Sequence, residues 1–181
     1  MRGLIVLWTL VMLSLWPDTF IFAKVYLTRD KALTQAFPMA DQVERKTLFL
    51  TEEEAERVEG LSRNRLDSRM FTYYVALSNN EVSGYAFLGS HIVRTKPVVY
   101  MIVINPDGSL RHVEILAFYE PEEYLPSGRW FNQFQGMVLD NRLMPKRGIS
   151  AVSGATLSVN SITAEVRKIL AIFKIKIQKG A

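Results

Sequence analysis

The sequence predicts an α+β fold in which an antiparallel sheet packs against helices. Two observations indicate this class. Strand-like segments in the middle of the chain are separated by turn signals, and the C-terminal stretch carries apolar residues at helical spacing. The length of 181 residues, 49% of them hydrophobic, suits one domain with a core of its own.

Four segments in the middle of the chain have the composition of strands and form two hairpins. The first pair is aromatic and β-branched and is joined at Asn79 and Asn80, a pair that favours a tight turn. The second pair is joined by a Pro-Asp-Gly-Ser turn. The predicted strands are Met70–Leu77, Val82–Leu88, Val98–Ile104 and Leu110–Phe118.

Helices are expected on either side of these strands. Residues 25–63 have a mixed polar and apolar pattern that favours helix, and Thr51 with Glu54 forms a capping box that starts a helix at about Glu52. Trp130, Phe134 and Met137 would share one face of a short helix. The last helix is amphipathic, with an apolar stripe of Ile162, Val166, Ile169, Leu170 and Phe173 and with Glu165, Arg167, Lys168 and Lys174 on its other faces. Its basic end also suits contact with anionic lipid, an alternative to ordinary compensation of the helix dipole.

The N-terminus has the pattern of an export signal. Arg2 is followed by the apolar stretch Leu4–Trp16 and by Ile-Phe-Ala, a small-residue cleavage site before Lys24. The apolar stretch ends at Pro17, short of the roughly 20 residues that span a bilayer. We therefore expect a cleaved signal peptide at residues 1–23 and a periplasmic or otherwise extracytoplasmic protein, with an uncleaved membrane anchor as the weaker alternative.

Composition argues against several kinds of function. The net charge is only +4 and its basic residues are dispersed, which does not favour a nucleic-acid partner. Without cysteine the chain has no disulfide, thiolate metal site or catalytic thiol, so redox chemistry would need a cofactor. His91 and His112 are the only histidines, and a structural role is favoured for them over a metal site.

The segment Gly148–Ser158 precedes the last helix and carries the most informative motif. Ser153, Gly154 and Ala155 are small enough for another molecule to approach the backbone, and the start of a helix favours a phosphate. Spacing alone leaves an alternative open, in which Ser153 or Thr156 only caps the helix.

Ser153-Gly154-Ala155-Thr156 strongly resembles the motif of the FMN-binding domain family, which includes subunits of sodium-pumping and Rnf-type electron-transport complexes and small exported proteins. The resemblance implies that Thr156 carries FMN covalently through a phosphodiester. It also implies a partner, a magnesium-dependent flavin transferase with FAD as donor. Ser150 stands where the family often has Asp.

The resemblance extends over about Met70–Phe173 and implies further site residues. It includes Gly84–Phe87, the strand Val98–Ile104, Trp130–Gly136 and the loop with Glu120, Pro121 and Tyr124, in which Glu123 replaces the family's Gly. Tyr124 would pack on the flavin or only cover the sheet edge. Glu120, Glu122 and Glu123 would make the pocket acidic and lower the flavin potential, unless they are simply solvated. Lys146 and Arg147 are candidate partners of the phosphate.

These observations lead to one leading hypothesis of function. A signal peptide (1–23) and an N-terminal helical segment (24–66) would precede an FMN-binding domain (67–177). This domain would pass electrons to a redox partner that the sequence does not identify, in a chain that is extracytoplasmic or associated with the membrane. Two alternatives stay open: an exported binding or assembly module of the same fold without flavin, and a flavin-dependent reductase of a small molecule.

Overall fold

The computed structural model describes residues 24–178, so the predicted signal peptide lies outside the described residues. Six strands form one antiparallel sheet in the order β1-β6-β5-β4-β3-β2. The strands are β1 (Lys24–Val25), β2 (Gln42–Phe49), β3 (Met70–Ser78), β4 (Glu81–Ile92), β5 (Pro97–Ile104) and β6 (Leu110–Phe118). The helices are α2 (Arg29–Ala36), α3 (Glu52–Ser62), α4 (Gly128–Phe131) and α5 (Thr156–Lys176), with the short 3₁₀ turns η1 (Glu122–Tyr124) and η2 (Asn132–Phe134).

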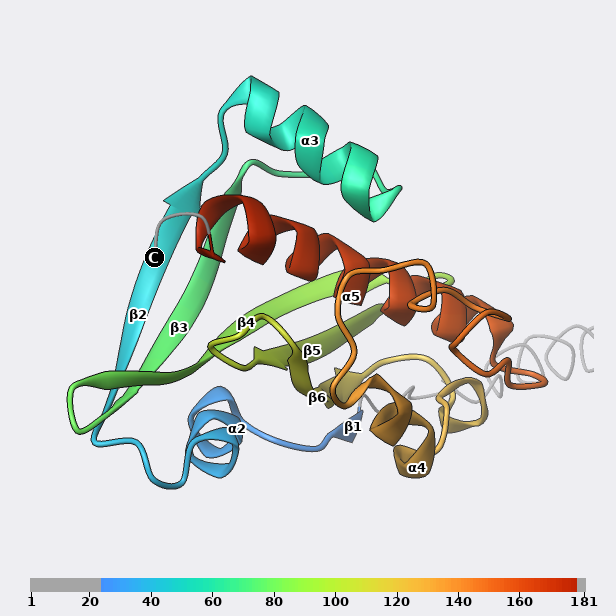
Figure 1. Cartoon of the computed structure of the whole chain (residues 1–181). Helices are drawn as coiled ribbons and strands as arrows, with labels where there is room; N and C mark the ends of the chain where they lie inside the picture. The colour runs from blue at the N-terminus through green and yellow to red at the C-terminus, as the bar shows by residue number, and fades with distance from the viewer. Residues whose placement is uncertain (1–23, 179–181) are drawn as a thin grey trace, which may run out of the picture.

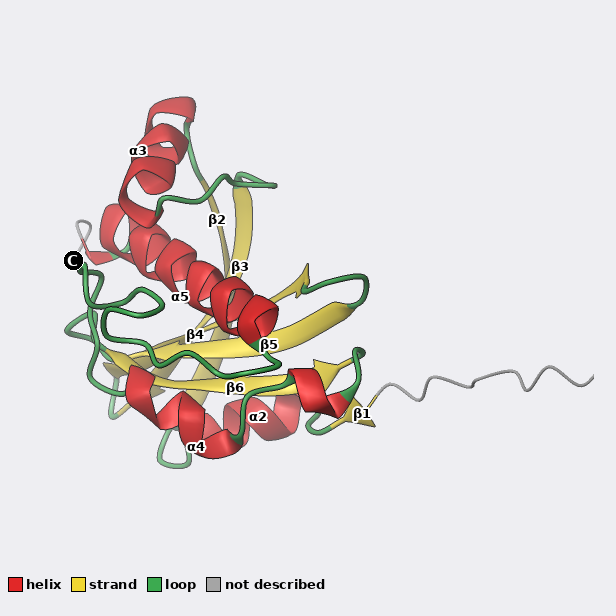
Figure 2. Cartoon of the chain, turned by 90° about the vertical axis from the view of Figure 1, so that its right-hand side faces the viewer, coloured by secondary structure: helices red, strands yellow, loops and turns green. Residues whose placement is uncertain are grey.

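The sheet lies between two layers of helix, which confirms the α+β class (Figure 1 and Figure 2). The larger core joins α5, α3 and the segment from α4 to η2 to one face of the sheet, through large side chains such as Phe87, Phe134 and Phe173. A smaller core joins α2 to the other face through Ala32, Leu33 and Phe37. Both faces of the central strands are therefore covered, which explains why Val98–Ile104 is continuously apolar.

The two predicted hairpins are confirmed. Asn79 and Asn80 both have positive φ, 52° and 63°, the conformation that a two-residue turn between right-twisted strands requires. In the second hairpin, Gly108 has φ 89° and its N–H donates to the carbonyl of Asn105. Local turn chemistry thus specifies the connections that build the centre of the sheet.

The helical prediction for residues 25–63 is wrong over Gln42–Phe49, which forms β2. This strand lies at the edge of the sheet and is exposed on most of both faces, with only Leu48 buried. An edge strand that is wet on both faces has no apolar alternation to reveal it. It is held by pairing with β3 along its whole length, from Gln42 opposite Leu77 to Phe49 opposite Met70.

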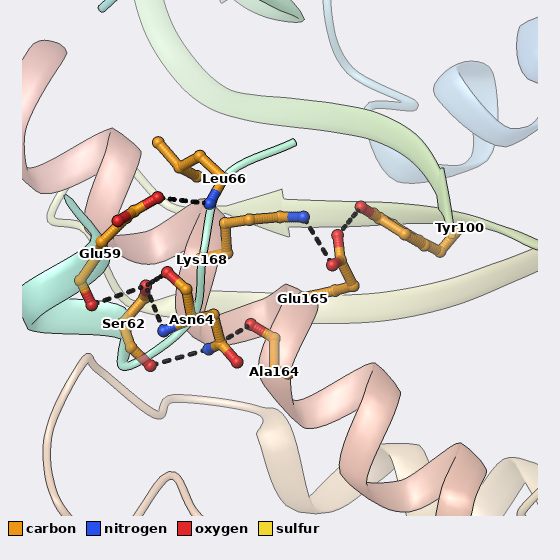
Figure 3. A network of polar contacts seen from close by, with 8 residues as sticks. All are labelled: Glu59, Ser62, Asn64, Leu66, Tyr100, Ala164, Glu165 and Lys168. Carbon is orange, nitrogen blue, oxygen red and sulfur yellow. Dashed lines mark hydrogen bonds and ion pairs between the residues drawn. The ribbon is translucent and has the colours of Figure 1, made fainter. Parts of the chain in front are cut away.

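The predicted capping box at α3 is confirmed. The Thr51 hydroxyl accepts from the Glu54 N–H at 3.2 Å, and the Glu54 carboxylate accepts from the Thr51 N–H at 2.9 Å. At its other end α3 is tied to α5, because the Asn64 side-chain amide donates to the carbonyls of Ser62 at 2.8 Å and of Ala164 at 3.3 Å (Figure 3). Sequence-local signals start α3, and contacts with α5 fix its end.

The helix predicted around Trp130 is shorter than expected. Trp130 and Phe134 are buried as predicted, but η2 ends at Phe134 and the chain turns at Gly136, where φ is 75°. Met137 therefore lies beyond the helix, where its carbonyl accepts from the N–H of Leu110 at 2.8 Å.

Candidate functional site

The segment before α5 is fixed by side chains of the preceding short helices. The indole N–H of Trp130 donates to the carbonyl of Ser150 at 2.8 Å, and the Ser150 N–H donates to the side-chain oxygen of Gln133 at 2.7 Å. Ser150 is thus held through its backbone while its side chain is exposed. These two bonds set the path of the chain toward Thr156.

The motif Ser153–Thr156 forms the turn that enters α5. Gly154 has φ 81°, a conformation that side chains rarely adopt, and a Cβ built on it would meet no atom within 4 Å. Ala155 is buried and anchors the turn, whereas Ser153 and Thr156 are exposed. Glycine is therefore needed here for its backbone conformation, and the space around it is open.

The start of α5 has no side-chain cap. Ala155 occupies the N-cap position, Thr156 is the first helical residue, and no side chain accepts a hydrogen bond at this helix start. The alternative in which Ser153 or Thr156 serves only as a cap is therefore wrong. The first N–H groups of a 21-residue helix are left available to a ligand or to water beside the exposed Thr156 hydroxyl.

A small cavity of about 240 Å³ adjoins Thr156. It is lined by Arg94, Tyr124 and the residues 154–158. The Ser158 hydroxyl donates to the carbonyl of Tyr124, which ties the η1 loop to the first turn of α5. The structure thus places Tyr124 and Thr156 at the same cavity.

Glu120 does not line this cavity. Its carboxylate accepts from the N–H groups of Thr95 at 2.7 Å and Lys96 at 2.9 Å and from the Thr95 hydroxyl at 3.2 Å. The Thr95 N–H, followed by that of Lys96 and by the hydroxyl, lowers the pKa of this carboxyl. Glu120 therefore holds the turn between β4 and β5, and this turn carries Arg94.

The acidic lining expected from the sequence is not found around Thr156. Glu120 is engaged by the turn, and Glu122 pairs with Lys24 at 2.6 Å and accepts from the Tyr26 hydroxyl at 3.0 Å. The cavity lining includes one charged side chain, that of Arg94. Glu120 and Glu122 contact other elements, and Glu123 does not line the cavity.

The cation that lines the cavity at Thr156 is Arg94, whereas the sequence suggests Lys146 and Arg147. Neither of these two residues lines the cavity at Thr156, and both are exposed. Arg94 is not predictable from the motif, because it lies in the turn between β4 and β5, far from Thr156 along the chain. The antiparallel pairing of β4 with β5 forms the turn that carries Arg94, and no local sequence pattern indicates that this turn lies near Thr156.

Several other cavities lie apart from the predicted site residues, among them two beside the sheet. One, about 400 Å³, follows the outer edge of β6 between Tyr26 and Gln135. The other, about 280 Å³, is bordered by Tyr100, Glu165 and Lys168, where the Tyr100 hydroxyl donates to Glu165 and the Lys168 ammonium lies 2.6 Å from the same carboxylate (Figure 3). The cavity at Thr156 is smaller than either, but it alone of the three includes residues of the predicted motif.

Within residues 24–178 no group of three His, Cys, Asp or Glu side chains is placed to hold a metal ion. No helix of this described part is long and apolar enough to cross a membrane. No protein-family model matches the sequence, and no curated protein matches it.

Proposed function

We propose that the chain is an exported electron-transfer flavoprotein that carries FMN on Thr156 through a phosphodiester. The observation that carries the proposal is the exposed Thr156 hydroxyl at the uncapped start of α5, within a Ser-Gly-Ala-Thr motif and beside a cavity. The motif supplies the resemblance to the FMN-binding domain family. The geometry supplies a hydroxyl that is free of a capping role.

The residues around Thr156 fit FMN in their chemistry. The N–H groups of the first turn of α5 and the Arg94 guanidinium favour a phosphate. Tyr124 and Leu157, which is 52% exposed, offer aromatic and apolar surface to a flat ring. Gly154 leaves the approach to Thr156 open, because no atom lies within 4 Å of a Cβ placed there.

When bound, FMN supplies the capacity to accept and release electrons. The chain's own residues hold it: Thr156 provides the covalent bond, and the turn at Gly154 presents its hydroxyl. Attachment removes the need for a high binding affinity in a compartment that does not make FMN. The fold thereby serves as a carrier that delivers the cofactor to a redox partner protein.

The proposed attachment is a phosphoryl transfer catalysed by the flavin transferase, with magnesium and FAD. The Thr156 oxygen forms a bond to the phosphorus on the FMN side of the FAD pyrophosphate. The bond from that phosphorus to the bridging oxygen breaks and AMP leaves, while the hydroxyl proton is released. The diester retains one negative charge.

Intact mass spectrometry after coexpression with the transferase tests the proposal. We expect a mature chain that begins at Lys24 and carries one FMN. Thr156→Ala should carry none, because no hydroxyl remains, and Asn160→Ala, a change at an exposed position of the same helix outside the motif, should be labelled as fully as the wild type. A wild-type chain that stays unmodified beside a control protein labelled by the same transferase would contradict the proposal and favour the flavin-free module.

A further inference from the structure

Arg94 is the one charged side chain that the 240 Å³ cavity beside Thr156 includes in its lining. Its guanidinium carbon lies 4.4 Å from the centre of the Tyr124 ring, within the range of a cation–π contact. No ion pair or hydrogen bond within residues 24–178 engages its guanidinium. A cation–π contact holds the plane of the group and leaves its N–H donors available at the edge.

The position of Arg94 is fixed from two sides. Its turn is closed by the N–H of Val93, which donates to the carbonyl of Lys96 at 3.1 Å, and by Glu120, which accepts from two N–H groups of the same turn. On the other side, Tyr124 is tied to α5 through the Ser158 hydroxyl. Three separate parts of the chain therefore meet to place one guanidinium beside Thr156.

The charge at this place suits the phosphate, which is the anionic part of an oxidised FMN. The isoalloxazine ring and the ribityl chain of an oxidised flavin are uncharged, whereas the phosphate is an anion with oxygens spaced for the guanidinium fork. A cavity with a cation and no acid in its lining would therefore distinguish FMN from riboflavin by the phosphate alone.

We propose that Arg94 is the positioning residue that binds the flavin phosphate at Thr156 and makes the site prefer FMN to riboflavin. This inference rests on the proposed function, since it assigns a role at the same site. Arg94 takes no part in forming the covalent bond. It holds the phosphate of the bound flavin, while Glu120 and Tyr124 hold Arg94.

The test measures the affinities of unlabelled protein, made in a host without the transferase, for FMN and for riboflavin by quenching of flavin fluorescence. We expect wild type to bind FMN about fivefold more tightly than riboflavin, a modest ratio because Arg94 is exposed to solvent. Arg94→Gln should reduce the ratio to about one and leave riboflavin affinity unchanged, and added salt should lower the wild-type ratio alone. Arg94→Lys should retain part of the preference, since it keeps the charge without the fork.

Lys96→Gln is the matched control, because it removes a cation from the same turn that does not line the cavity. An Arg94→Gln ratio equal to wild type, a wild-type ratio of one, or no binding of either flavin would each overturn the inference. Riboflavin affinity reports whether the variant keeps the site intact. Covalent labelling is read separately by mass: a chain that is never labelled, yet shows an Arg94-dependent preference for FMN, would overturn the proposed function and leave this inference standing.

Discussion

The carboxylate of Glu120 holds the turn between β4 and β5 through three hydrogen bonds. Two of the donors are backbone N–H groups, which have no partner within a tight turn unless a side chain or water supplies one. Arg94 directly precedes Thr95, one of the residues whose N–H groups donate to Glu120. The buried Glu120 carboxylate therefore fixes the position of the Arg94 cation relative to Thr156. Glu120 thus acts on the proposed site through the backbone.

At the residue scale we predict that Glu120→Ala lowers the free energy of unfolding by about 1 kcal/mol. The backbone N–H groups of Thr95 and Lys96 lose their acceptor and hydrogen-bond to water instead. It should also weaken the FMN preference that we assign to Arg94. Glu123→Ala is the control, an exposed glutamate of the same loop. Urea unfolding of the two variants measures the difference, and equal stabilities would show that Glu120 does not hold the turn.

Arg167 gives α5 a second buried face. Its guanidinium donates to the carbonyls of Leu61 at 2.9 Å and Ser62 at 3.0 Å, at the end of α3, and to those of Asp140 at 2.9 Å and Leu143 at 3.1 Å. The last carbonyls of a helix have no partner within the helix and carry partial negative charge, so a cation is favourable there. Arg167 and Lys168 lie off the apolar stripe, as the sequence predicts, yet both are buried. Contacts with α3 and the loop 140–143 bury Arg167.

At the element scale we predict that Arg167→Met lowers the free energy of unfolding by about 2–4 kcal/mol, since buried carbonyls lose their donors while the side-chain volume is kept. The free energy of unfolding of Arg167→Lys should lie between those of the wild type and Arg167→Met, because a lysine ammonium reaches fewer of the four carbonyls than the guanidinium fork does. Lys174→Met is the control, on an exposed position of the same helix. If chemical unfolding gave Arg167→Met and Lys174→Met the same stability, Arg167 would not be the link between α3 and α5.

At the scale of the whole molecule, folding lowers the pKa of two histidines. Burial is the main cause that lowers the pKa of both His91 and His112, with Lys168 acting in the same direction on His91 and Arg111 on His112; Glu165 opposes it at His91. Both ring nitrogens of His91 are buried and have no hydrogen-bond partner among the described residues. Protonation of either ring is therefore easier in the unfolded chain than in the folded one.

At the scale of the whole molecule we predict that stability falls as the pH drops below about 6.5, the ordinary histidine pKa. In this range the unfolded chain binds more protons than the folded chain, so each lowering of pH favours unfolding until the lower native pKa is reached. Glu114, whose pKa burial raises, acts in the opposite sense at lower pH, nearer 4.5.

Thermal unfolding at about pH 7.5 and about pH 5.5 measures the effect, on either side of the ordinary histidine pKa. His91→Phe keeps a ring at this position and removes two unpartnered nitrogens, so it should reduce the loss of stability on acidification without lowering the melting temperature at the higher pH. A wild-type melting temperature that is the same at both values, or an unchanged acid response in His91→Phe, would contradict the assignment.

Much of the fold is predictable because its signals are local. The capping box at Thr51, the paired asparagines at 79 and 80, and the continuous apolar run of β5 each act through neighbours in sequence. Such signals depend on backbone conformation and hydrogen bonds within a few residues, so they can be recognised without knowledge of the rest of the fold.

The sequence by itself determined the α+β class, the two hairpins and Thr156 at the first turn of the last helix. Tertiary structure alone decided that Gln42–Phe49 is a strand, that Glu120 binds a turn, and that Arg94 stands beside Thr156. The reason is physical. An exposed edge strand forms because the backbone of the neighbouring strand offers free hydrogen-bonding groups. A carboxylate or guanidinium binds whichever unpaired group the fold brings within reach, and neither interaction produces a periodic pattern in the sequence.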